Sequence, residues 1–237
     1  MSVVVSMYRI DFNDFFTSAF SVDCILFGYS EGEIKALLIK RAMQPFENLW
    51  AIPGDLIYPD EDLEQAAERV LFELTGLNNI AMHQSQTFGK PNRHPQGRVI
   101  TISYFALLRI EDFEVKASSW AGDVQWVSLK NMPDLAFDHN HILSSTYEML
   151  KLKLQNEPIC FDVLPERFTL NEFQQLYEFA FEQAFDKANF RKKIKYIPLI
   201  AHDEKQQNVK HRPAKLFSFD KTSYEEATTQ NRYTFKM

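Results

Sequence analysis

Short hydrophobic stretches in the first half of the chain predict β-strands. Residues 22–27 and 34–41 are apolar and β-branched, and the turn-like sequence Ser-Glu-Gly-Glu separates them, which indicates two paired strands. The sequence RVITISYFALLR, at 98–109, gives the strongest strand pattern. Further segments of the expected sheet follow at 50–57, 82–88 and 124–128.

Two stretches show the three- and four-residue spacing of amphipathic helices. Residues 63–75 lack Gly and Pro and place their apolar side chains on one side: Leu63, Ala66, Ala67, Val70, Leu71 and Leu74. Residues 139–156 have a similar face: Ile142, Leu143, Tyr147, Leu150 and Leu154. Strands interrupted by one helix and closed by another predict a mixed α/β fold, an α/β/α sandwich.

A second unit is expected after the break at Asn-Glu-Pro, so we divide the chain into domains 1–156 and 157–237. Thr169 and Glu172 have the spacing of a capping box before one helix, and Asp186 can cap a second, basic helix at 187–196. Apolar segments at 197–201 and 216–219 flank a polar stretch and predict a hairpin. This order is that of a winged helix-turn-helix, followed by a polar tail from about Thr222 that we expect to be poorly ordered.

Composition fits a globular protein: 45% of the 237 residues are hydrophobic and 24% are charged. No apolar run approaches the roughly 18 residues of a membrane span, and the start has no basic leading segment typical of a signal peptide. Cys24 and Cys160 lie in apolar settings without metal-type spacing. We therefore expect reduced cysteines in a cytoplasmic protein, with no membrane partner.

Charge is distributed unevenly along the chain. The net charge is −6, yet residues 187–221 contain ten basic and three acidic side chains. An acidic body with a basic segment indicates a nucleic-acid-binding module. The alternative is a solvated surface whose charges cluster by chance.

The sequence PGDLIYPDEDLEQAAERVLFELTGL, at 53–77, resembles a Nudix box with most of its chemistry removed. It keeps Glu61, Arg69, Leu71 and Glu73, but has Asp55 for Gly, and Val70 and Leu74 for two Glu. In that family, carboxylates at 70, 73 and 74 hold a divalent metal against a diphosphate, and aliphatic groups cannot replace them. We therefore expect a retained fold without hydrolase activity, in which Arg69 and Glu73 form an intrahelical ion pair.

The whole layout resembles the Nudix-related transcriptional regulators of bacteria, in which a Nudix-like domain senses a metabolite and a winged helix binds operator DNA. The likeness lies in LWAIPGD, VLFELTGL, RHPQGRVITISYFAL, LAFDH, DKANFRKKI and HRPAKLFSF. His211 departs from the Gly that relatives often have before Arg-Pro. One branch senses ADP-ribose or related NAD metabolites, and another resembles pentose-responsive repressors, especially of L-arabinose operons. Loss of the metal carboxylates favours the sugar branch.

Candidate sites follow from these patterns. Asp138 is either a helix N-cap or part of the pocket, and Arg93, His94 and Arg98 either face the ligand or solvate a loop. His139 and His141 would point to different sides of a helix, so neither a metal nor a cofactor is expected. The predicted effector-binding residues are Arg41, Glu73, Arg93, Arg98 and Asp138. The predicted DNA-binding residues are Lys187, Asn189, Arg191, Lys192, Lys195, Lys210, Arg212 and Lys215.

Three functions compete. The first is a ligand-responsive transcriptional regulator, the second is an active hydrolase of nucleoside diphosphate derivatives such as ADP-ribose, and the third is an RNA-binding or protein-interaction module. The decayed box favours the first. Because winged-helix proteins commonly pair two half-sites, we also expect a homodimer, with the apolar segment 3–16 available to cover a partner.

Overall fold

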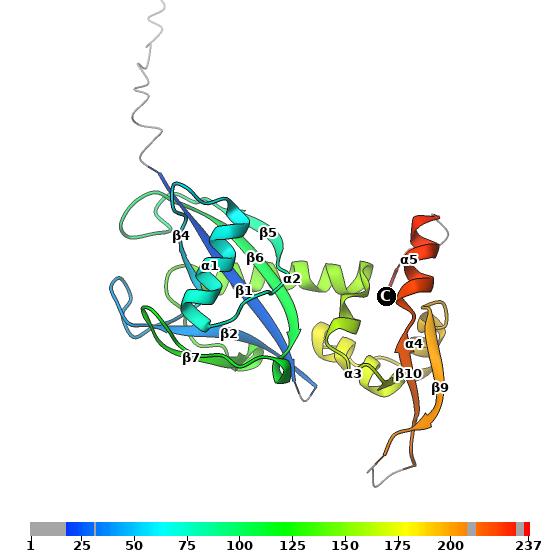
Figure 1. Ribbon diagram of the computed structural model, residues 1–237. Helices are drawn as coiled ribbons and strands as arrows, with labels where there is room; N and C mark the ends of the chain where they lie inside the picture. Colours follow the sequence, from blue (N-terminus) through cyan, green and yellow to red (C-terminus); the bar gives the residue numbers. More distant parts are fainter. Residues whose placement is uncertain (1–17, 31, 208–211, 231–234) are drawn as a thin grey trace, which may run out of the picture.

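The computed structural model describes residues 18–30, 32–207, 212–230 and 235–237. They form an α/β domain followed by a smaller domain (Figure 1). None of the helices in these ranges is both long and apolar enough to span a membrane. The elements of the first domain are β1 (Ala19–Ser30), β2 (Glu33–Arg41), β3 (Trp50–Ala51), β4 (Gly54–Leu56), α1 (Leu63–Thr75), β5 (His83–Phe88), β6 (Val99–Arg109), η2 (Ile110–Asp112), β7 (Ala121–Ser128), η3 (Leu129–Asn131) and α2 (His139–Asn156).

The sheet of the first domain is mixed, and its two longest strands lie at the centre. β1 and β6 run parallel from the pair Ala19–Val99 to the pair Tyr29–Arg109. The strand order is β3-β2-β1-β6-β5, with β4 paired to β1 and β7 paired to β2. β1 is longer than the predicted 22–27, because ladder pairing includes polar positions at its ends. β6 begins one residue later than the predicted 98–109.

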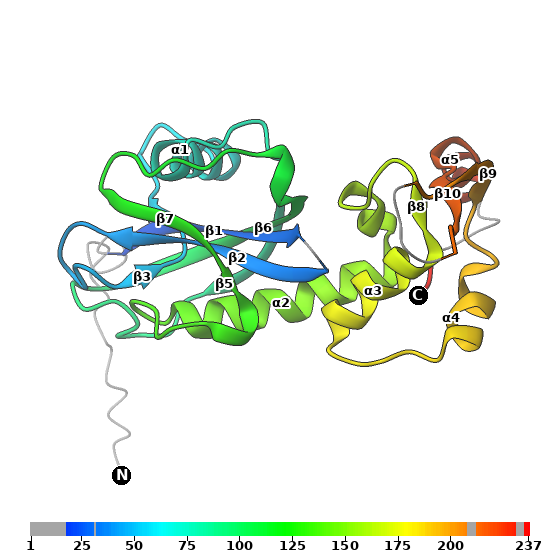
Figure 2. The same ribbon diagram turned by 90° about the horizontal axis from the view of Figure 1, so that it is seen from below.

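Helix α1 covers one face of the sheet and α2 covers the other (Figure 2). Along β1, Val22 and Leu26 pack in the cluster beneath α1, whereas Ile25 and Phe27 pack in the cluster beneath α2. Asp23 has the same parity as Ile25, so its carboxyl faces the α2 side. The predicted α/β/α sandwich is confirmed, and both helices have the predicted bounds.

The second domain is the predicted winged helix. The capping box of Thr169 and Glu172 is confirmed, because each side chain accepts a hydrogen bond from the other's backbone N–H. The basic helix ends at Ile194 and not at Tyr196, whose side chain is 76% exposed. The elements are η4 (Pro158–Asp162), β8 (Phe168–Thr169), α3 (Leu170–Phe181), α4 (Lys187–Ile194), β9 (Leu199–Lys205), β10 (Lys215–Phe219) and α5 (Lys221–Thr229).

The prediction of a poorly ordered tail from Thr222 was wrong for residues 222–230 and 235–237, and its remaining part, 231–234, lies outside the described residues. Asp220 caps α5, accepting a hydrogen bond from the Ser223 N–H at 3.0 Å. Phe235 is 1% exposed and packs edge-on against Phe161. The segment is mostly polar, so its sequence pattern did not indicate that its aromatic side chains complete the core of the domain.

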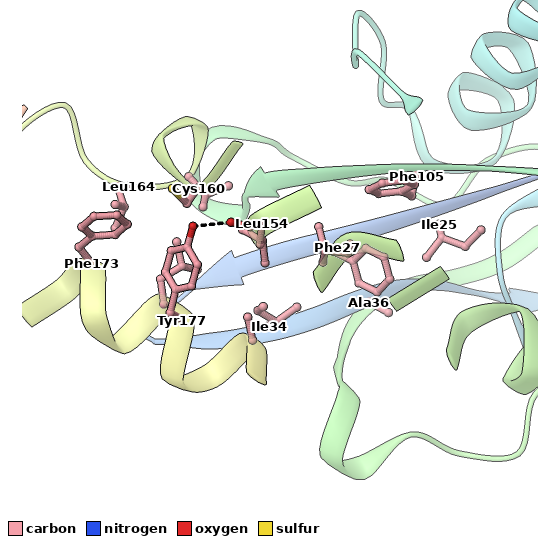
Figure 3. Close-up of a cluster of buried hydrophobic side chains, with 14 of the residues drawn as sticks. Ile25, Phe27, Ile34, Ala36, Phe105, Leu154, Cys160, Leu164, Phe173 and Tyr177 are labelled. Atoms are coloured by element: carbon pink, nitrogen blue, oxygen red, sulfur yellow. Dashed lines mark hydrogen bonds between the residues drawn. The ribbon is translucent and has the colours of Figure 1, made fainter. Parts of the chain in front are cut away.

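One buried cluster extends from the α2 face of the sheet into the second domain (Figure 3). The Tyr177 hydroxyl donates to the Leu154 carbonyl at 2.6 Å, and the Tyr147 hydroxyl donates to the Ala180 carbonyl at 2.8 Å. α2 and α3 are therefore joined by packing and by hydrogen bonds. The boundary between domains 1–156 and 157–237 stays a prediction; α2 ends at Asn156.

Candidate effector pocket and DNA-binding surface

A cavity of about 340 Å³ lies where β1, β4, the loop before β6 and the start of α2 meet. Its volume is in the range of small-molecule sites. Its lining contains acidic, basic and aromatic side chains close together. These side chains include Asp23, Arg41, Asp55, Arg93, Trp120 and His139.

Arg41, the last residue of β2, is held rigidly at the cavity wall. Its Nε donates to the Pro45 carbonyl at 2.7 Å, and its guanidinium lies 5.0 Å from the Trp120 ring and 4.9 Å from the Phe137 ring. Burial lowers the pKa of Arg41, while the Asp55 carboxylate opposes that shift. Its Nη groups have no hydrogen-bond partner among the described residues, which leaves them available to a ligand.

Arg93 is fixed by a two-pronged ion pair with Asp138. Its Nε and Nη2 donate to the two Asp138 oxygens at 2.9 and 2.6 Å, and its Nη1 donates to the Thr101 hydroxyl. Asp138 is the predicted N-cap residue of α2 by position, but its side chain makes no capping hydrogen bond, because the Arg93 guanidinium engages both carboxylate oxygens.

Asp23 and His139 form the buried floor of the cavity. The His139 Nδ1 accepts from the Ile52 N–H at 3.0 Å, and its Nε2 lies 3.7 Å from Asp23 Oδ2. Burial raises the pKa of Asp23 to about 7, with Arg93 opposing and Asp138 reinforcing the shift. Burial lowers the pKa of His139 to about 3. His141 lies elsewhere, exposed against the Phe88 ring, so the two histidines do point apart as predicted.

Three predicted effector residues lie outside the cavity lining: Asp138, which contacts the lining residue Arg93 through their ion pair, and Arg98 and Glu73. Arg98 instead ties its loop together, with Nη1 donating to the Gly89 carbonyl at 2.5 Å. Glu73 is 41% exposed on α1 and pairs with Arg69 at 3.2 Å, which confirms the predicted ion pair. The structure therefore places Arg41 and Arg93 in the cavity lining, pairs Asp138 with Arg93 beside it, and leaves Arg98 and Glu73 elsewhere.

The box helix does not fit the divalent metal that a Nudix fold implies. Val70 and Leu74 are 0% and 1% exposed and pack in the core, where carboxylates would stand in an intact box. Glu61 and Glu73 are both paired with Arg69. The described residues contain no group of three or more His, Cys, Asp or Glu that could hold a metal ion.

Sequence reasoning missed Asp23, Trp120 and Phe137, and it left His139 out of the predicted effector-binding residues. A signal was present for Asp23, because it is a charged residue inside a continuous apolar strand. A buried charge without an obvious partner is a frequent mark of a functional site. The other three lie in segments whose sequence shows no such conflict.

The basic surface belongs to α4 and the hairpin. Phe190 and Ile194 are buried, so the helix is anchored as predicted. Asp186 caps it, accepting from the Asn189 N–H at 2.9 Å. Lys210 lies outside the described residues, as does His211, which replaces the Gly that relatives often have before Arg-Pro. The other predicted DNA-binding residues are all exposed: Lys187, Asn189, Arg191, Lys192, Lys195, Arg212 and Lys215.

Comparisons with known proteins agree with both halves of this architecture. Residues 17–147 match the NUDIX domain model, and residues 160–219 match the NrtR DNA-binding winged helix domain model. The chain is 28% identical, over 90% of its length and 86% of the relative, to the ADPR responsive transcriptional repressor NtrR of Acinetobacter baylyi.

Solved structures give the same result. Shewanella oneidensis NrtR complexed with a 27mer DNA has a TM-score of 0.69 and 30% identity, covering 91% of this chain and 97% of that one. The NUDIX domain of the same protein complexed with ADP ribose has a TM-score of 0.54 and 32% identity, covering 63% and 99%. The chain therefore belongs to the NrtR-type family of DNA-binding transcriptional regulators, in which a Nudix domain precedes a winged helix.

Proposed function

We propose that this chain is a repressor whose Nudix domain binds a five-carbon sugar, either as a free pentose or as the terminal ribose of ADP-ribose. The observation that carries the proposal is the cavity at Asp23, Arg41 and Arg93. It lies in the sensor domain, near the start of the helix that contacts the winged helix. Binding there can bias the DNA-binding domain through α2.

The charges in the cavity favour a free pentose such as L-arabinose. The lining contains two acidic side chains, Asp23 and Asp55, and two basic ones, Arg41 and Arg93, so their formal charges balance. Sugar hydroxyls both donate and accept hydrogen bonds, and they match such a mixed lining. A diphosphate would meet two carboxylates without a metal to offset them, while Arg93 is already engaged by Asp138.

ADP-ribose is the second candidate, and the relatives favour it. One of them is named as ADPR responsive, and the solved NUDIX domain of another contains ADP ribose. Both ligands carry a five-carbon sugar, so the same cavity can serve either. The two differ in what lies beyond the sugar ring.

Isothermal titration of L-arabinose, D-ribose and ADP-ribose, with and without Mg²⁺, separates the candidates. We expect a pentose to bind without metal and to change operator affinity. Arg41→Ala should weaken binding at least about ten-fold, because its Nη groups are available to the ligand and hydrogen bonds to charged groups are strong. Arg98→Ala is the matched control and should change affinity less than about two-fold, because Arg98 lies outside the cavity. Binding of ADP-ribose alone would assign the pocket to the nucleotide.

We also propose that the domain does not hydrolyse ADP-ribose. Val70 and Leu74 cannot coordinate Mg²⁺, and a metal that both clamps phosphates and activates water needs several oxygen ligands. The test is turnover of ADP-ribose with Mg²⁺ or Mn²⁺. Turnover that Glu73→Gln abolishes would contradict the proposal.

The repressor is further proposed to act as a homodimer. A single helix such as α4, eight residues long, buries little surface on DNA, and paired half-sites raise affinity. The segment 3–16, which we expect to aid pairing, lies outside the described residues. Light scattering without DNA should give twice the 27.8 kDa chain mass. A monomer mass at micromolar concentration would contradict this.

A further inference from the structure

We propose that Asp23 and His139 bracket one hydroxyl group of the sugar effector and thereby determine which sugar is recognised. The hydroxyl donates to Asp23 Oδ2 and accepts from the His139 Nε2–H. This inference rests on the proposed function and names the contact that gives the pocket its selectivity.

The position of Asp23 follows from strand register. In β1 it stands opposite Gly54 of β4 and beside Ser103 of β6, with its side chain on the α2 face. The residue is 4% exposed, and no described residue is within hydrogen-bonding reach of its Oδ2. Leaving a carboxylate oxygen buried and unpaired is costly, so its presence in a cavity lining points to a ligand group.

His139 supplies the complementary donor. Its Nδ1 accepts a hydrogen bond from the Ile52 N–H, so the ring proton is on Nε2. Burial lowers the pKa of His139, and the ring is therefore neutral and keeps this single proton. Nε2 is 3.7 Å from Asp23 Oδ2, too far for a good direct hydrogen bond. Donor and acceptor thus lie side by side without satisfying each other.

A hydroxyl is the group that satisfies both atoms. It donates one hydrogen bond and accepts others, whereas an ether or carbonyl oxygen cannot donate to Asp23. A phosphate oxygen would be repelled by the carboxylate. The pair therefore selects a sugar carbon that bears a free hydroxyl, and it rejects the corresponding deoxy carbon.

Gly54 shows that the fold is fitted to this carboxylate. A Cβ at position 54 would stand 2.0 Å from Asp23 Oδ1 and 2.9 Å from the Val22 carbonyl. No side chain fits there without displacing Asp23. The backbone of β4 therefore approaches the carboxylate as closely as glycine permits.

The experiment is a coupling measurement with deoxy sugars. Titration calorimetry compares the tightest-binding pentose with each of its monodeoxy analogues, on the unaltered chain, Asp23→Asn, Asp23→Ala and Asp55→Asn. We expect one analogue to bind the unaltered chain at least about ten-fold more weakly, because a buried polar pair is left unsatisfied. In Asp23→Ala that penalty should shrink to about two-fold, and Asp23→Asn should reduce it. Asp55→Asn, the matched control, should retain the full penalty, since Asp55 Oδ2 already accepts from Trp120 Nε1 at 3.1 Å.

The outcomes separate the two claims. Circular dichroism verifies that each variant is folded before titration. An equal deoxy penalty in the unaltered chain and in both Asp23 variants would overturn the bracket and leave Asp23 and His139 as a structural pair only. If ADP-ribose alone binds, the same comparison is made with its analogues deoxygenated on the terminal ribose. No binding of any pentose or of ADP-ribose would overturn the proposed function, and the bracket with it.

Discussion

Replacing Asp23 with asparagine should stabilise the protein at pH 8. The Asp23 carboxyl is enclosed beneath α2, and burial raises its pKa from 3.8 to about 7, with the Arg93 charge opposing and Asp138 reinforcing the shift. Keeping it ionised in the folded protein costs up to about 4 kcal/mol, from about three pKa units at about 1.4 kcal/mol each. An amide of the same shape carries no charge and removes that cost.

The sign of the pH dependence follows from proton binding. Between pH 3.8 and about 7 the folded state holds a proton on Asp23 that the unfolded state lacks, so its contribution to stability increases as pH falls. His139 behaves oppositely, because its pKa falls from 6.5 to about 3 and the unfolded state binds the extra proton. Between about pH 4 and 6.5 the two slopes, each about 1.4 kcal/mol per pH unit, nearly cancel in the unaltered chain.

Urea unfolding followed by tryptophan fluorescence from pH 4.5 to 8 measures the difference. Asp23→Asn should exceed the unaltered chain in stability by up to about 4 kcal/mol at pH 8. That advantage should decline by about 1.4 kcal/mol per pH unit below pH 7. A difference that does not change with pH would refute the reasoning, since it would mean that the Asp23 carboxyl titrates as in the unfolded chain.

Four further substitutions test other parts of the structure. Arg191→Ala should cost roughly 1–3 kcal/mol of binding free energy on operator DNA and less on random DNA. Lys192→Ala should weaken binding to both duplexes and lower the slope of log affinity against log salt concentration by about one. Equal losses for Arg191→Ala on both duplexes in anisotropy titrations would contradict base reading by Arg191. Phe235→Ala should cost about 3–5 kcal/mol in urea unfolding, because the ring is 1% exposed, and a negligible loss would show that it does not pack. Glu73→Ala should leave effector affinity unchanged and cost only about a few tenths of a kcal/mol; weaker binding in calorimetry would place the pocket nearer α1.

Local patterns made much of the fold predictable. The helices at 63–75 and 139–156 have the predicted bounds, because their apolar spacing and end residues lie within each segment. The capping box at Thr169 is equally local. The prediction for the C-terminal tail failed because the contacts that bury its aromatic side chain are not local. Phe235 lies in a polar stretch, and its burial depends on packing against Tyr224 and against Phe161, which is distant in the sequence.

The candidate site was half predictable. Arg93 and Arg98 flank the same turn and look equivalent in sequence. Arg93 lines the cavity and pairs with Asp138, whereas Arg98 donates a hydrogen bond to the Gly89 carbonyl outside it. Asp23 meets Gly54 through strand register and meets His139 through the packing of α2. Those neighbours are distant along the chain, so no local pattern places them together.

The shared core between the two domains restricts how such a regulator can diversify. Phe27 and Leu154 lie in the sensor and Phe173 and Tyr177 in the winged helix, yet all four belong to one buried cluster. Exchanging the sensor for an unrelated domain would expose these faces to water, at about 25 cal/mol for each Å² of apolar surface. New effector specificities are therefore expected to arise by substitution inside the pocket, and not by shuffling of whole domains.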